Sequence, residues 1–129
     1  MPTKDLLDEL SHKVIGASIE VHRLLGPGLL ESIYSECLAI ELSELGVSVE
    51  REVIVPLRYK NKELSKPLRL DLLVDHCLIV EAKTVDALQP VHSAQLLTYL
   101  KMTDLKLGLL LNFNVVVMRD GIKRIVNGL

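Results

Sequence analysis

The sequence predicts an α/β sandwich in which a mixed sheet is packed against helices. Apolar residues recur at helical spacing through the first 45 residues, and the period then changes to two, which is typical of strands. The helical period returns once, near residue 90, and a continuous apolar run follows it. The resulting order, α-α-β-β-β-α-β with a small β tail, corresponds to a three-stranded meander, a crossover helix and a returning strand.

Two helices are expected at the start of the chain. Residues 3–24 carry a wide apolar stripe, Thr3 is suited to cap the helix, and Gly26-Pro27-Gly28 ends it. A second apolar stripe runs from Leu29 to Leu45, and Gly46 follows it as a C-terminal glycine. The Gly-Pro-Gly segment predicts a sharp turn between these two helices.

Three strands are expected next. Residues 47–59 alternate in polarity and predict a long strand with an irregularity near Arg51-Glu52. Residues 68–74 and 77–83 are shorter apolar runs, and only Asp75-His76 separates them. These two runs therefore predict a β-hairpin with a tight turn.

The last third of the chain predicts a crossover helix, a buried strand and a small hairpin. The helix begins at residue 87 or 90 and ends at 102, and residues 107–113 are too continuously apolar for an exposed edge. Residues 115–118 and 122–126 are expected to pair across Arg119-Asp120-Gly121, which is a strong turn signal.

Length and composition indicate one domain spanning residues 1–129. Hydrophobic residues make up 49% of the chain, which predicts either a large core or apolar surface buried in a homodimer. No apolar run reaches the roughly 18 residues that a membrane helix needs, so no membrane partner is expected. Cys37 and Cys77 have neither metal-binding nor redox spacing, so we expect a cytoplasmic protein.

The net charge of −2 is unevenly distributed along the chain. Residues 1–50 carry −6, residues 51–100 carry +1 and residues 101–129 carry +3. Dedicated DNA-binding domains are usually strongly basic, so this balance argues against tight non-specific duplex binding by a monomer. It leaves open an enzyme that contacts phosphate through a metal ion and a few cationic side chains.

The segment Glu81-Ala82-Lys83 is the most informative in the chain. In a strand Glu81 and Lys83 project to one face, and Asp71 lies in the neighbouring run. Two carboxylates and an ammonium in a half-buried sheet are costly unless something compensates them. A divalent metal is the usual compensation, and a metal with a lysine suits phosphodiester cleavage. A structural ion pair on the sheet surface is the alternative interpretation.

Four motifs occur in a characteristic order. They are G-x-x-E-x-x-Y over residues 28–34, Asp71, the E-x-K of residues 81–83, and Q-x-x-x-Y over residues 95–99. This set resembles the PD-(D/E)XK nuclease superfamily and, within it, the small family named for its G-x-x-E-x-x-Y motif. The resemblance covers nearly the whole chain. The proline that often precedes the aspartate is absent, because Leu70 stands there.

The resemblance implies a PD-(D/E)XK nuclease-like sandwich and a nuclease that uses Mg²⁺ or Mn²⁺ to activate water. It assigns the catalytic set to six residues: Glu31, Asp71, Glu81, Lys83, Gln95 and Tyr99. The implied metal ligands are Asp71 and Glu81 directly, with Glu31 bound directly or through water. The implied partner is nucleic acid, with DNA as the expected substrate.

The remaining site residues have open roles. Lys83 would orient the attacking water or stabilise charge on phosphorus. Gln95 and Tyr99 share a helix face and would contact phosphate, Lys83 or the metal waters, or else simply pack on the sheet. Glu31 would otherwise favour only the helix dipole. At the level of function, the alternative is a catalytically weak nucleic-acid- or protein-binding module.

Overall fold

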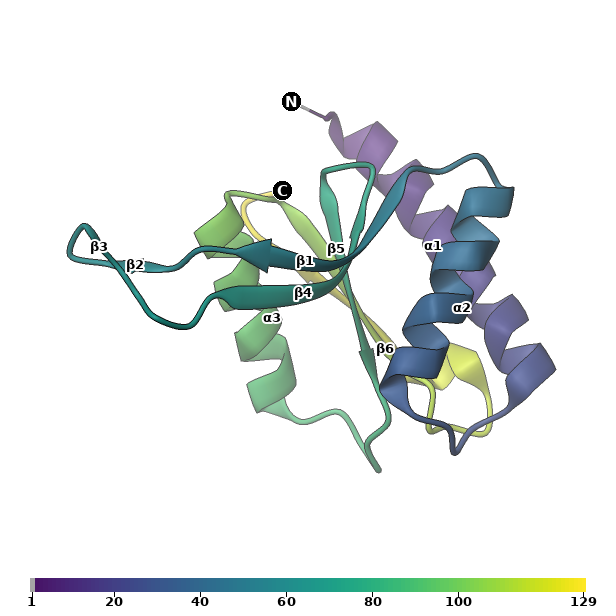
Figure 1. The fold of residues 1–129 in the computed structure, drawn as a ribbon. Coiled ribbons are helices and arrows are strands. Elements are labelled where there is room, and N and C mark those ends of the chain that lie inside the picture. The colour runs from purple at the N-terminus through teal and green to yellow at the C-terminus, as the bar shows by residue number, and fades with distance from the viewer. Residues whose placement is uncertain (1) are drawn as a thin grey trace.

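The computed structural model describes residues 2–129, which form three helices and a five-stranded mixed sheet (Figure 1). The helices are α1 (Lys4–Leu25), α2 (Glu31–Glu44) and α3 (Pro90–Thr103). The sheet has the order β1-β4-β5-β6-β7. Its strands are β1 (Val49–Val55), β4 (Leu68–Val74), β5 (Leu78–Lys83), β6 (Leu107–Asn112) and β7 (Ile122–Val126). The predicted α/β fold class is therefore confirmed.

Helix α1 begins and ends where the sequence indicates. The Thr3 hydroxyl accepts a hydrogen bond from the Leu6 amide at 3.2 Å, which satisfies one of the free N–H groups of the first turn. Gly26 follows the helix with φ 70°, and its N–H donates to the His22 carbonyl at 2.8 Å. This left-handed backbone turns the chain into α2, which packs beside α1.

The strand connections match the predicted meander and crossover. β4 pairs antiparallel with β1 and with β5, and Asp75 and His76 make the tight turn between β4 and β5. α3 then carries the chain to β6, which lies parallel to β5. α1 and α2 cover one face of the sheet and α3 covers the other, so the sheet is buried on both sides (Figure 1).

The expected long strand over residues 47–59 is wrong beyond Val55. β1 ends at Val55, and Pro56, which has no N–H for a ladder hydrogen bond, follows it. Beyond it, β2 (Arg58–Tyr59) pairs with β3 (Lys62–Glu63) as a separate two-stranded hairpin. Figure 1 shows this hairpin projecting from the body of the molecule.

The expected C-terminal hairpin is also wrong. Residues 115–118 form no strand, because β7 itself occupies the free edge of β6. Met118–Gly121 instead forms a 3-10 helix, η1. Gly121 is required there because a Cβ atom at this position would lie 2.1 Å from the Asn112 carbonyl oxygen. The Val115 carbonyl is held by His22 of α1 at 2.7 Å, so this segment packs on the helical layer.

Candidate active site

The β4–β5 ladder opens at Asp71 and Glu81. Backbone pairing runs from Val74 to Leu72 on β4 and ends where Asp71 and Glu81 would be the next pair. Side chains replace the ladder there. The Asp71 amide donates to Glu81 Oε2 at 2.8 Å, and the Ala82 amide donates to Asp71 Oδ2 at 2.9 Å. Each carboxylate is therefore fixed by the backbone of the other strand, and the two acids lie together in the gap.

A change of face along β4 accompanies this opening. Leu70 packs in the cluster beside α3, whereas Leu72 packs in the cluster beside α1 and α2. Residues two apart in a regular strand keep to one face, so β4 must be strongly twisted at Asp71. On β1, Glu52 lies opposite Asp71 with φ 51°, and the ladder skips this pair as well. The twist thus exposes Asp71 to the gap between the strands.

Burial raises the affinity of both carboxyl groups for protons. Glu81 is only 5% exposed, and burial together with the charge of Asp71 raises the pKa of Glu81 to about 8. Burial also raises the pKa of Asp71, against the opposing effects of the Ala82 amide and Lys83. A bound proton or cation stabilises such a pair of carboxyl groups. The pair is destabilising when both groups are ionised and no cation neutralises them.

Lys83 lies at the end of β5, on the same face as Glu81. Ala82 packs in the core beside α1 and α2, so alternation along the strand directs its two neighbours toward the opposite face. The Lys83 carbonyl accepts a hydrogen bond from the Phe113 amide at 2.9 Å, which fixes the strand end beside β6. Its positive charge lowers the pKa of both Asp71 and Glu81. The acids and the lysine therefore form one electrostatic unit.

Glu31 is the first residue of α2 and lines a cavity of about 200 Å³ together with Asp71. The turn before it is fixed by Tyr34, whose hydroxyl donates to the Gly26 carbonyl at 2.6 Å and accepts from the Leu29 amide at 3.1 Å. The Tyr34 ring is fully buried and stacks on Phe113 with centroids 4.3 Å apart. The motif tyrosine thus has a packing role that places Glu31 at the site.

The two α3 residues of the predicted set differ in their surroundings. Tyr99 is half-buried and packs against the core on the α3 side. Burial and the negative charges of Glu81 and Asp71 raise the pKa of its hydroxyl, so this group belongs to the same electrostatic site. Gln95 is exposed, and its side chain makes no hydrogen bond within residues 2–129. Its role therefore stays a prediction.

Comparison with known proteins agrees with this geometry. A family model described as "PD-(D/E)XK nuclease superfamily" matches residues 8–125. The chain belongs to the PD-(D/E)XK nuclease superfamily. Members of this superfamily generally use divalent metal ions. A solved chain described as "Crystal structure of SSO0001" is 14% identical, with a TM-score of 0.49 over 93% of this chain and 78% of that chain. No curated protein gives a significant match.

The free oxygens of Asp71 and Glu81 show whether this pair fits a divalent metal ion. Asp71 and Glu81 each use one oxygen in the bonds described above, and the second oxygen of each has no donor among residues 2–129. Mg²⁺ is usually held by one or two carboxylates with waters and substrate phosphate, so this pair fits. Over the same residues, no group of three or more His, Cys, Asp or Glu side chains is arranged to hold a metal ion. Glu31 as a third ligand stays a prediction.

Two arginines near this candidate site were not identified from the sequence. Arg51 of β1 and Arg69 of β4 line the same cavity as Glu31 and Asp71. Arg69 also lies 3.7 Å from Glu52 across an exposed ion pair. Their position beside Asp71 gives the site cations suited to phosphate. The only signal for them in the sequence was their alternation with apolar residues, which does not distinguish a site from solvent.

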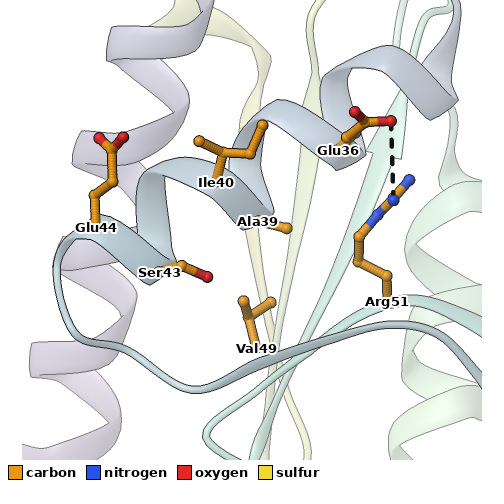
Figure 2. A pocket seen from close by; sticks show the side chains of 7 residues that line it. All are labelled: Glu36, Ala39, Ile40, Ser43, Glu44, Val49 and Arg51. Atoms are coloured by element: carbon orange, nitrogen blue, oxygen red, sulfur yellow. Dashed lines mark ion pairs between the residues drawn. The ribbon is translucent and has the colours of Figure 1, made fainter.

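A larger hollow of about 610 Å³ lies between α2 and β1. Figure 2 shows its lining, with Arg51 directed toward Glu36 at one end and Ile40 and Val49 farther along. Arg51 approaches Glu36 at 3.9 Å and also lines the smaller cavity beside Asp71. The two acids that line this hollow, Glu36 and Glu44, lie at its opposite ends and are not brought together as Asp71 and Glu81 are (Figure 2). Arg51 lies between the two depressions.

Asn112 was also not singled out, although it supports the site. It is buried at the end of β6, where its side chain accepts from the Val85 amide at 3.1 Å and donates to the Val85 carbonyl at 2.9 Å. These bonds hold the segment that follows Lys83. A polar residue closing an otherwise apolar run is the sequence signal that could have identified it.

Proposed function

We propose that this chain is a metal-dependent nuclease that hydrolyses phosphodiester bonds in DNA, with Mg²⁺ or Mn²⁺ held by Asp71 and Glu81. The observation that carries the proposal is the opened β4–β5 ladder, in which the buried Glu81 and the half-buried Asp71 lie together beside a lysine. Superfamily membership supports the same reaction class.

Each side chain of the candidate site has a distinct proposed role. Asp71 and Glu81 would hold the metal, and Glu31 would bind it directly or through water. A divalent ion bound there would lower the pKa of a bound water and offset the phosphate charge. Lys83 would orient that water or stabilise charge developing on phosphorus, while Arg51 and Arg69 would bind the phosphate backbone.

We further propose that the chain belongs to the G-x-x-E-x-x-Y family and acts as a homodimer. The structural role of Tyr34 in placing Glu31 supports the first point, because it explains why that motif joins these two residues. Exposed apolar side chains support the second, since Leu24 and Leu30 are 61% and 70% exposed on the helical layer. Sedimentation of the purified chain tests the dimer.

A binding module without turnover is the second candidate function. It is favoured by the arrangement of the acids, since residues 2–129 contain no ready-made three-ligand metal group. Such a module would bind nucleic acid or protein but show no metal-dependent cleavage. Its function would tolerate Asp71→Asn, whereas a nuclease would not.

Substitution of the lysine tests the proposal. Lys83→Ala should reduce cleavage of duplex or single-stranded DNA by roughly 10²-fold or more, because transition-state charge loses its partner. Mn²⁺ binding should be largely retained, since the carboxylates remain. Lys13→Ala, which removes an exposed lysine from α1, should cleave like the wild type. Equal cleavage by wild type and Lys83→Ala would contradict the proposed mechanism.

A further inference from the structure

The β2–β3 hairpin and its flanks form an arm, residues 56–67, that stands apart from the folded body (Figure 1). Every residue of the arm except Leu57 is exposed. Lys60 and Asn61 form its tip, with φ values of 50° and 66° that suit a tight hairpin turn. Near its base the Leu64 amide donates a hydrogen bond to the Leu57 carbonyl at 2.8 Å.

The arm concentrates positive charge in an otherwise acidic chain. Residues 56–67 contain four Lys or Arg residues and one Glu, giving +3, so the rest of the chain carries −5. The cationic residues are Arg58, Lys60, Lys62 and Lys66. None of the four forms an ion pair within residues 2–129. The charges of the arm are therefore directed to solvent rather than to acids of the chain.

The arm contributes little to the stability of the fold. An isolated two-stranded hairpin is at best marginally stable in water, and this one buries almost no apolar surface. Tyr59 is 64% exposed, with the Lys60 ammonium 5.5 Å from its ring centre. A projecting basic ribbon with an exposed aromatic ring is suited to binding another molecule.

The arm begins close to the candidate active site. Its base is the Val55–Leu68 pair, and Asp71 lies three residues farther along β4, at a distance of about 10 Å. Arg69 lies between them and lines the cavity beside Asp71. In a DNA duplex, which rises 3.4 Å per base pair, about 10 Å corresponds to roughly three base pairs. Cations of the arm and the acid pair could thus contact one duplex together.

We propose that the arm binds the phosphate backbone of duplex DNA next to the bond held at Asp71 and Glu81. This inference rests on the proposed nuclease function and names how its substrate is held. A two-stranded ribbon fits the major groove of B-form DNA, and lysines along it release counterions from the phosphates. The arm therefore provides a basic surface for DNA, although the net charge of the whole chain is negative.

The test compares two double variants by fluorescence anisotropy with a labelled duplex across a range of salt concentrations, in EDTA so that no cleavage occurs. Lys60→Gln/Lys62→Gln removes two arm charges without touching Arg58, whose guanidinium holds the Asn61 carbonyl. The control, Lys4→Gln/Lys13→Gln, removes two exposed charges from α1, across the molecule from the arm (Figure 1).

The arm variant should bind at least about tenfold more weakly at about 0.1 M salt, and its salt slope should fall by about 2. The control should keep the wild-type slope. Equal changes in both variants, or none in either, would overturn the inference. So would loss of binding to single strands alone, or a change in sedimentation without a change in slope.

The two proposals fail in different ways. A chain that binds duplex through the arm in EDTA but never cleaves in Mn²⁺ supports the arm and overturns the nuclease function. A chain that cleaves in Mn²⁺, but whose affinity for duplex is the same with and without the arm lysines, overturns the arm alone.

Discussion

Glu81 occupies the least hydrated carboxyl position of the site, and its titration should govern the stability of the metal-free protein. Burial and Asp71 raise its pKa from 4.5 to about 8, so the folded state keeps a proton that the unfolded chain loses. The stability contributed by this proton is fully present below about pH 4.5 and is lost as the pH rises through about 8. A bound divalent cation would stabilise the ionised form of Glu81 in place of the proton.

Glu81→Gln should abolish this part of the pH dependence. The glutamine keeps an oxygen for the Asp71 amide but cannot ionise. In urea unfolding with EDTA, wild type should lose stability between about pH 5 and about pH 8.5, whereas Glu81→Gln should lose clearly less. Glu44→Gln, an exposed change on α2, should follow wild type. Identical pH profiles for wild type and Glu81→Gln would contradict the electrostatic account.

At the scale of elements, the α1–α2 turn determines where Glu31 lies. Tyr34→Phe removes the hydroxyl that satisfies the Gly26 carbonyl and the Leu29 amide, and it keeps the ring on Phe113. The unfolding free energy should fall by about 1–3 kcal/mol, because two backbone groups lose their partner.

Urea unfolding measures this change, with Tyr59→Phe as the matched control. Tyr59 is exposed on the arm, so the same loss of a hydroxyl should alter stability by no more than about 0.5 kcal/mol. If Tyr34→Phe were as stable as wild type, the hydroxyl would not be what holds the turn.

The elements show what periodicity can and cannot predict. The helical stripe of α1 and the alternation of β4 report local burial, so their bounds followed closely from the sequence. The separate β2–β3 hairpin was missed although Pro56, which cannot donate to a ladder, is a local signal against one continuous strand. The 3-10 helix at residues 118–121 was missed because it depends on which strand takes the edge of β6. Local patterns do not encode competition for a sheet edge.

At the scale of the whole molecule, the sequence predicted the acids but not how they meet. Asp71, Glu81 and Lys83 were expected on neighbouring strands of one sheet. The opened ladder, in which each acid binds the other strand's backbone, depends on the twist of β4 and on Glu52 across from it. Arg51 and Arg69 line the cavity beside Asp71, and this position too follows from tertiary packing rather than from the local pattern. Within residues 2–129, no helix is long and apolar enough to span a lipid bilayer.

The central claim is that Asp71 and Glu81 hold a catalytic metal, and calorimetric titration of Mn²⁺ tests it most directly. Wild type should bind saturably above about pH 8, and Asp71→Asn should lose at least about tenfold in affinity. Glu44→Gln should bind like wild type. Wild-type binding that is absent in millimolar Mn²⁺, or that survives unchanged in Asp71→Asn, would contradict the assignment of this pair as the metal site.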